Sequence, residues 1–418
     1  MKTATSTLER PPQRVKTAAA LLAAGVDAGS WSTRCVILAL EGNYLRYLGH
    51  GEAPSSGWLK GRVNDHKRVS DAIQEAVRAA EGSAGIGVES AVVGVGGPTV
   101  YGFDSHWAYR FARAREVAGD EMAFAIEQAA RVSLEHDRMI LHICPQFFTV
   151  DGRPGFTDPT GVECSRLEAN VHLITTSTQE THSVVSAMHQ AHLAVEETVY
   201  EPLAAAYAAV LPEERSRGIA VVDVGMQSTD LVIYEGDALV HSVSLPVSGD
   251  HLTKDAAWGL CIAYEDAEDL KTEYGCAILG LTGDNSSIVV PSRERREARE
   301  VSRRDLNRIL DARSEELFSY VAGEISRVGM ERSLLEGVVL TGAATLLNGM
   351  LDMAERVLNC QARKGLAVGV KDLPAELNSS EWTTAVGLAR YSARLKIRRE
   401  KRRRPPGLLS APPRPPPP

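Results

Sequence analysis

The chain has 418 residues and a mass of 45.1 kDa, enough for about two to three domains. Hydrophobic residues make up 44% of it and charged residues 24%, as in ordinary globular proteins, which excludes a wholly disordered chain. The sequence lacks an apolar run of about 18 residues, which excludes a transmembrane helix, and its net charge of −8 argues against a general nucleic-acid-binding protein.

The first 20 residues are predicted to be a disordered lead. They are polar and contain the pair Pro11-Pro12. The apolar stretch Ala18–Val26 imitates the core of a secretory signal. It runs directly into the turn that begins at Asp27, however, and cleavage there would destroy the best motif of the chain. We therefore reject a signal peptide.

The strands and helices that follow are predicted to alternate. Alternating and continuous apolar runs indicate the strands, and apolar residues at helical spacing indicate the helix. The predicted elements are strands over 23–26, 33–40 and 45–53, a helix over 69–80 with Gly82 as its stop, and a strand over 91–95. This order favours an α/β fold in which helices cover a mixed sheet.

The opening motif of this unit occurs twice. Asp27–Thr33 reads D-A-G-S-W-S-T, and Asp223–Thr229, 196 residues later, reads D-V-G-M-Q-S-T. Each copy follows a short apolar strand and leads into another strand, which then turns at a Gly-centred loop. A single D-x-G sequence is more often only a hairpin turn, but two copies with matching flanks indicate a duplicated α/β unit.

Such hairpins suit a polyphosphate. A tight turn aims backbone N–H groups into one concavity, glycine allows close approach, and hydroxyl groups add donors. Carboxylates at the strand ends would repel phosphate but can hold Mg²⁺, usually through water. The candidate phosphate residues are Gly29, Ser30, Ser32, Gly225, Ser228 and Thr229, and the candidate magnesium residues are Asp27 and Asp223, which we also count among the nucleotide-binding residues.

Two further segments are candidates for the nucleoside. The strand Val338–Thr341 ends in a small-residue loop that includes Gly342 and Ala343, where a flat base can lie against backbone before a helix predicted over 346–357. Glu268 and Lys271 share one face of a predicted helix and could reach a ribose, although taken alone they are better explained as a solvated pair.

Together these motifs resemble the actin-like ATPase superfamily and, within it, the FtsA family of bacterial cell-division proteins. The resemblance runs from about Gly25 to about Tyr391. The segments that match are 92–98 (VVGVGGP), 141–146 (LHICPQ), 171–175 (VHLIT), 221–225 (VVDVG), 267–271 (AEDLK), 274–277 (YGCA), 339–342 (VLTG) and 384–388 (TAVGL).

The resemblance implies an actin-like (ribonuclease H-like) duplicated two-domain α/β fold around a nucleotide cleft, with the FtsA-type 1C subdomain. The domain boundaries that it suggests are 21–98, 169–200 and 378–393 for subdomain 1A, 99–168 for 1C, 201–235 and 304–377 for 2A, and 236–303 for 2B.

The function that the resemblance implies is cell division at the septum. The protein would bind ATP and Mg²⁺, polymerise into filaments, link FtsZ filaments to the cytoplasmic membrane as a peripheral protein, and recruit later divisome proteins through 1C. The FtsZ C-terminal tail would dock on 2B, with Arg303 and Arg304 as candidate contacts, although basic residues on a helix more often form a solvated face. No nucleic-acid partner is expected.

Glu201 is the candidate catalytic residue, because the segment Glu201–Ala205 resembles the E-P-x-A-A segment in which a glutamate orients water in bacterial actins. Without that role, Glu201 is an acid at a helix start, followed by a proline. Whether ATP is hydrolysed stays open. The family's second hairpin commonly reads G-G-G-T-T, and Met226 and Gln227 here would crowd backbone meant to touch phosphate. Ala343 and Ala344 also stand where glycine is usual.

The C-terminal end departs most from the family, which normally ends in an amphipathic membrane helix. From 394 to 404 there are eight basic residues and one acid, and eight of the last 14 residues are prolines. We therefore expect 394–418 to be a basic, proline-rich tail, with polyproline conformation in its last part. A polybasic stretch can bind anionic lipid, or it can be a solubilising or partner-binding tail. The candidate membrane residues are Lys396, Arg398, Arg399, Lys401, Arg402, Arg403 and Arg404.

Two rival functions share the hairpins: an actin-like type IV pilus assembly protein, and a small-molecule kinase of the same superfamily. The kinase would need a catalytic Asp in the cleft, and no sugar-binding signature stands out. His189 and His192 lack a third ligand for zinc and are expected on a surface helix. The six cysteines follow no metal spacing and are expected to be buried free thiols.

Overall fold

The computed structural model describes residues 21–282, 286–290 and 298–403. The lead expected over residues 1–20 lies outside this part of the chain. Arg404 and the proline-rich end of the expected tail also lie outside it.

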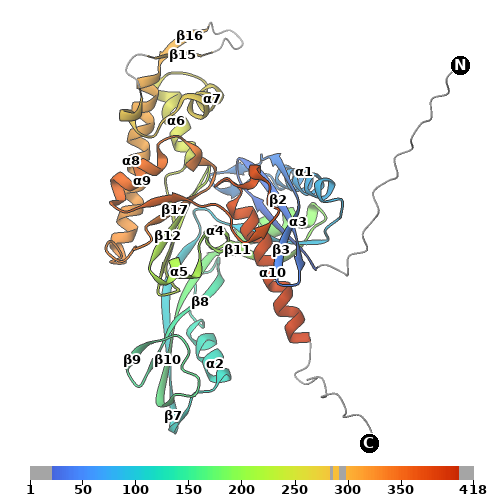
Figure 1. Ribbon diagram of the computed structural model, residues 1–418, viewed down its shortest axis with the longest axis vertical. Coiled ribbons are helices and arrows are strands. Elements are labelled where there is room, and N and C mark those ends of the chain that lie inside the picture. Colours follow the sequence, from blue (N-terminus) through green and yellow to red (C-terminus); the bar gives the residue numbers. More distant parts are fainter. Residues whose placement is uncertain (1–20, 283–285, 291–297, 404–418) are drawn as a thin grey trace, which may run out of the picture.

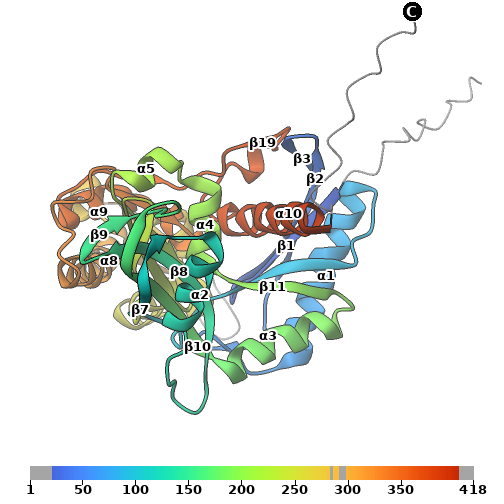
Figure 2. The same ribbon diagram turned by 90° about the horizontal axis from the view of Figure 1, so that it is seen from below.

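A six-stranded sheet forms the centre of the first half, in the order β11-β6-β1-β2-β3-β19. Successive side chains of β2 point to opposite faces. Cys35 and Ile37 therefore pack on α1 and α3, whereas Val36 and Leu38 pack on α10 (Figure 2). The bounds are β1 Leu21–Ala28, β2 Ser32–Glu41, β3 Tyr44–Pro54, β6 Ser90–Val95, β11 Ala194–Tyr200, β19 Val370–Lys371, α1 His66–Ala84, α3 Thr178–Gln190 and α10 Thr383–Arg403.

A nine-stranded sheet continues through the second half and into a lobe at its far end, in the order β18-β17-β12-β13-β14-β7-β10-β8-β9. The junction is the pairing of Val243 on β14 with Tyr101 on β7. The bounds are β12 Ile219–Val224, β13 Thr229–Glu235, β14 Ala238–Leu245, β17 Val338–Thr341, β18 Ala362–Lys364, β7 Tyr101–Glu116, β8 Arg138–Val150, β9 Arg153–Phe156 and β10 Glu163–Ser177.

Two lobes extend from opposite ends of the second half (Figure 1). One consists of β7 to β10 and α2 (Gly119–Ala129), which corresponds to the expected 1C subdomain. The other, the expected 2B subdomain, contains α6 (Gly249–Gly259), α7 (Tyr264–Tyr274), η1 (Leu279–Leu281), β15 (Ser287–Val290), β16 (Arg299–Ser302) and the start of α8 (Arg303–Arg327). The remaining elements are β4 (Trp58–Leu59), β5 (Arg62–Val63), α4 (Glu201–Ala209), α5 (Pro212–Ser216), η2 (Ala343–Leu346), α9 (Met350–Leu358) and η3 (Ala375–Leu377).

The duplication is visible in strand register. In the first half Asp27 pairs with Arg34 across β1 and β2, and in the second half Asp223 pairs with Asp230 across β12 and β13. The two halves meet where α4 and α10 cross. They approach so closely that a Cβ on Gly387 would overlap the carbonyl of Ala204. This close contact fixes the two halves, and with them the two hairpins, relative to each other.

Several local expectations were wrong. Gly82 lies inside α1, which continues to Ala84 and ends at Gly85, where φ is 66° and the helix can no longer propagate. The helix expected from residue 346 begins at Met350, after the short η2 turn. Residues 394–403, expected to be tail, continue α10.

Two side-chain placements also differ from expectation. Cys261 is exposed, although all six cysteines are free. His189 is on α3, as expected, but His192 follows the helix in a turn with φ of 62°. Within the described residues, no helix is long and apolar enough to cross a membrane.

Candidate functional site

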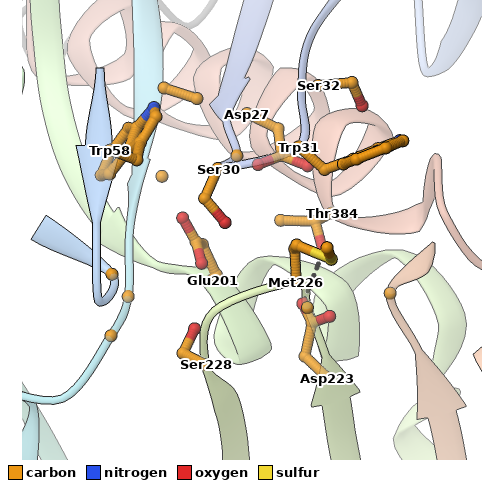
Figure 3. A pocket seen from close by; sticks show the side chains of 18 of the residues that line it. Asp27, Ser30, Trp31, Ser32, Trp58, Glu201, Asp223, Met226, Ser228 and Thr384 are labelled. Atoms are coloured by element: carbon orange, nitrogen blue, oxygen red, sulfur yellow. Dashed lines mark hydrogen bonds between the residues drawn. The ribbon is translucent and has the colours of Figure 1, made fainter. Parts of the chain in front are cut away.

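A cleft lies between the two halves (Figure 3). Both repeated hairpins contribute to its walls, together with the loop after β6, the start of α4 and the loop after β17. The predicted residues that line it are Asp27, Gly29, Ser30, Ser32, Glu201, Asp223, Gly225, Ser228, Gly342 and Ala343.

Asp27 and Asp223 line this one cleft from opposite walls (Figure 3). Burial raises the pKa of Asp27 to about 6, although the charge of Arg34 opposes the shift. Burial and then the charge of Asp27 raise the pKa of Asp223 to about 7, against a hydrogen bond that Thr384 donates over 2.9 Å. Two mutually repelling carboxylates in a buried site favour a bound cation or a bound proton.

Glu201 is the first residue of α4 and faces the hydroxyl of Ser30 across the cleft (Figure 3). Burial, and then the charges of Asp27, Asp230 and Asp223, hold the pKa of its carboxyl well above the usual range. Glycines make room for this side chain, since a Cβ on Gly96 would overlap its carboxylate. The glycine-containing segment at the end of β6 therefore packs directly against the side chain of Glu201.

Glycine is required in two of the predicted loops. A Cβ on Gly29 would lie 2.7 Å from the carbonyl oxygen of Ser32, inside the first hairpin turn. Gly342 has φ of 88°, and a Cβ there would overlap the carboxylate of Asp223 and the carbonyl of Val224. The loop after β17 therefore approaches the second hairpin more closely than any side chain would allow.

Three predicted residues do not line the cleft. Thr229 is fully buried in β13. Glu268 and Lys271 form an ion pair of 2.7 Å within the 2B lobe, and the ammonium group of Lys271 also donates to the hydroxyl of Thr253 over 2.8 Å. Their side chains are only 14% and 10% exposed, so the expectation of a solvated pair was wrong.

Other cleft residues were missed by sequence reasoning. Trp31 and Trp58 line it, and so do Arg34 and Thr384. Asp230 does not line the cleft but is a further buried carboxylate behind its wall. Burial raises its pKa, and hydrogen bonds oppose part of that shift. The register offered a signal for Asp230, because it directly follows the second motif and faces Asp223 across the hairpin.

The residues of the cleft fit a nucleotide with a divalent cation. The carboxylates supply negative charge for the cation, and the glycine turns leave backbone groups accessible. Arg34 lines the cleft, but its guanidinium is bonded to Glu52 and Glu381 over 2.8 and 2.9 Å. With that cation engaged, a polyphosphate would depend on its metal ion to offset the acidic walls.

The candidate partner and membrane residues that the structure describes do not line the cleft. Arg303 begins α8, and its side chain donates to the carbonyl of Tyr274 over 2.9 Å, whereas Arg304 is exposed. On α10, the ammonium group of Lys396 is paired with Glu196 over 2.8 Å and also donates to the carbonyl of Leu22. Lys396 therefore contributes to the fold, whereas Arg398 and Arg399 are exposed.

Comparison with solved structures defines the class. The chain superposes on the structure titled "PilM-PilN type IV pilus biogenesis complex" with a TM-score of 0.64 at 19% identity, covering 88% of this chain and 98% of that one. It superposes on MreB 5 of Spiroplasma citri bound to AMPPNP with a TM-score of 0.52 at 13% identity, covering 91% and 98%. The protein has the actin-like α/β fold, two related halves around a cleft.

Sequence comparison defines the family. A profile described as "Cell division protein FtsA" matches residues 220–387, and one described as "SHS2 domain inserted in FTSA" matches residues 97–175. The chain is 31% identical to Cell division protein FtsA of Pseudomonas aeruginosa over 369 residues, 88% of each chain, and 29% identical to that of Escherichia coli K12, covering 91% and 92%. The chain belongs to the FtsA family of cell division proteins.

Family membership decides between the functions considered above. It assigns a role in cell division and confirms the actin-like fold with its inserted subdomain. The inserted domain covers the lobe of β7 to β10. The pilus protein shares the fold at lower sequence identity, so that likeness concerns the fold alone.

Proposed function

We propose that the protein binds ATP with Mg²⁺ in the cleft, assembles into filaments, and links FtsZ filaments to the cytoplasmic membrane while recruiting later divisome proteins through its 1C lobe. The observation that carries the nucleotide proposal is the equivalent position of Asp27 and Asp223, each at the end of the first strand of its hairpin and both facing one cleft.

In this proposal Asp27 and Asp223 hold the magnesium ion, usually through water. Gly29, Ser30 and Ser32 in one half, and Gly225 and Ser228 in the other, contact the phosphates. Gly342 and Ala343 lie against the base. The ion, when bound, neutralises phosphate charge. Glu268 and Lys271 are left as candidates for the ribose only if the 2B lobe moves, because their side chains are engaged with Thr253.

Glu201 is proposed to orient a water molecule near the terminal phosphate. Its carboxyl lines the cleft beside Ser30, which supports that position. Burial and the neighbouring carboxylates raise the pKa of Glu201, and a bound cation would oppose this shift. Turnover is expected to be slow, because Met226 lines the cleft and adds bulk at the second phosphate loop.

The FtsZ tail is proposed to dock on the 2B lobe near Arg303 and Arg304. Arg304 is exposed in the first turn of α8, so a carboxylate-bearing peptide can approach it. Titration of an FtsZ C-terminal peptide against the purified protein tests this proposal. Saturable binding supports the cell-division link, whereas a peptide that does not bind at millimolar concentration contradicts it.

Membrane contact is proposed through the basic end of α10. Arg398 and Arg399 are exposed on the helix that projects from the body (Figure 1). Lys401, Arg402 and Arg403 continue the same helix. Anionic lipid attracts such a segment with about 1 kcal/mol per charge near the surface. The proposed location is peripheral, on the cytoplasmic face at the division site.

A further inference from the structure

One hydrogen bond joins the second phosphate loop to a hairpin of the other half. The side-chain oxygen of Gln227 accepts from the backbone N–H of Gly61 over 2.8 Å, across 166 residues of sequence. Gln227 lies between β12 and β13, in the second half. Gly61 lies between β4 and β5, in the first half. The bond therefore spans the two walls of the cleft.

The β4–β5 hairpin is a compact arm. Its turn residues Lys60 and Gly61 both have positive φ, 52° and 73°, as in the tightest two-residue hairpin turns. Its base is fixed because the N–H groups of Asn64 and Asp65 both donate to the carbonyl of Gly57, over 2.8 and 3.0 Å. The arm is thus shaped locally, and only its tip depends on the other half.

The tip of this arm fits closely at the phosphate end of the cleft. A Cβ on Gly61 would lie 2.9 Å from Pro98, and a Cβ on Gly97 would lie 3.0 Å from the carbonyl oxygen of Gly61. Gly61 and Trp58 both line the cleft, and Trp58 lies on the side of Ser30 and Glu201 (Figure 3). The arm is therefore a wall of the site.

Trp58 leaves a donor without a partner on this wall. Its indole N–H is buried, and within the described residues no atom accepts from it. A buried donor of this kind costs free energy unless a ligand or a water satisfies it.

We infer that Gln227 is a positioning residue that fastens the β4–β5 arm across the phosphate end of the nucleotide site. The inference rests on the proposed nucleotide function and adds a residue that controls how fast the nucleotide dissociates. A glycine at this position, as the family pattern commonly has, cannot make the bond. The crowding expected from Gln227 is thus accompanied by a contact that closes the site. A carboxamide also accepts the Gly61 N–H without adding negative charge to acidic walls.

The size of the effect follows from a single bond. Loss of the hydrogen bond is expected to raise the equilibrium constant for opening of the arm about fivefold, which corresponds to about 1 kcal/mol at 25 °C. We expect Gln227→Leu, which keeps the size of the side chain and removes the acceptor, to raise both the local opening of residues 57–63 and the dissociation rate of a fluorescent ATP analogue by that factor. Gln190→Leu, a change on the exposed end of α3, is the matched control and is expected to alter neither.

Hydrogen exchange without nucleotide tests whether the Gln227–Gly61 hydrogen bond holds the arm, independently of ATP binding. Mass spectrometry of peptides covering 57–63 is expected to show about fivefold faster exchange in Gln227→Leu, with an unchanged melting temperature. Unchanged exchange of residues 57–63 in Gln227→Leu would contradict the positioning role of Gln227, even if the protein binds ATP. If the wild-type chain does not bind the analogue, the nucleotide proposal fails. The exchange result still shows whether Gln227 holds the arm.

Two further variants keep the test decisive. Gln227→Gly, which restores the residue common in the family pattern, must show the same faster exchange if Gln227→Leu folds poorly. Gln227→Glu retains an acceptor oxygen and is expected to keep the protection of residues 57–63 while weakening nucleotide binding through its charge. Loss of protection in Gln227→Glu, or its retention in Gln227→Gly, would contradict the assignment.

Discussion

Replacement of Asp223 by asparagine should stabilise the protein without nucleotide while removing a proposed magnesium ligand. Asp223 is 9% exposed, and burial together with the charge of Asp27 raises its pKa from 3.8 to about 7. Ionisation of this carboxyl thus opposes folding. Asparagine carries no charge and keeps an oxygen to accept the hydrogen bond from Thr384.

The raised pKa of Asp223 determines how the free energy of unfolding changes with pH. An acid whose pKa is higher in the folded state than in the unfolded state contributes stability below pH 3.8, and that contribution is lost as the pH rises through about 7. The free energy of unfolding of the wild type should therefore fall over this range. With these pKa values, ionisation opposes folding by about 2 kcal/mol at pH 5 and about 4 kcal/mol at pH 8, as upper estimates.

Urea unfolding at pH 5 and pH 8, without nucleotide and with EDTA, measures the effect. Asp223→Asn should exceed the wild type in stability at pH 8, and its advantage should shrink at pH 5. Asp237→Asn, at an exposed position in the turn after β13, is the control and should change little at either pH. A variant less stable than the wild type at pH 8 would refute the reasoning that the carboxylate is strained by burial.

Two further predictions concern the surfaces proposed for partners. Lys396→Ala should lower the free energy of unfolding by about 2–3 kcal/mol, because it removes the counter-charge of the Glu196 carboxylate, whose side chain is 4% exposed and which then keeps hydrogen bonds from the hydroxyls of Ser90 and Ser392. Arg398→Glu should instead leave urea unfolding unchanged and weaken sedimentation with anionic vesicles, and equal vesicle binding would contradict the proposed membrane contact. Arg304→Glu should weaken binding of an FtsZ tail peptide about tenfold, as measured by isothermal titration calorimetry, because a charge-assisted contact is lost. Arg332→Glu, at a second exposed arginine, is the control. Unaltered affinity in Arg304→Glu would place the docking surface elsewhere.

The duplication could be predicted because the motif occurs twice with matching flanks, whereas the actin-like fold was expected from the resemblance to the FtsA family. An Asp at the end of a strand, followed by a glycine turn and a second strand, forms the same hairpin in each half. Because the two hairpins suit one polyphosphate, the two carboxylates were expected at one cleft, and both line it in the structure. Local patterns decide such features, so one sequence is sufficient.

Contacts between distant segments could not be predicted in this way. Neither the composition of the arm nor that of the loop indicates that Gly61 would meet Gln227. Lys271 was expected to be solvated because its spacing from Glu268 is that of an ordinary surface pair, and its burial depends on Thr253 from another helix. Lys396 was expected in a tail because the local charge density hides its pairing with Glu196.

Titration of ATP by calorimetry, with Mg²⁺ and then with EDTA, tests the central claim most directly. If Asp27 and Asp223 hold one magnesium–nucleotide unit between them, the wild type binds ATP at least about tenfold more tightly with Mg²⁺, a difference of about 1.4 kcal/mol, and Asp27→Asn loses this advantage. Equal affinity in EDTA, or a Mg²⁺ advantage that survives in Asp27→Asn, would contradict the account.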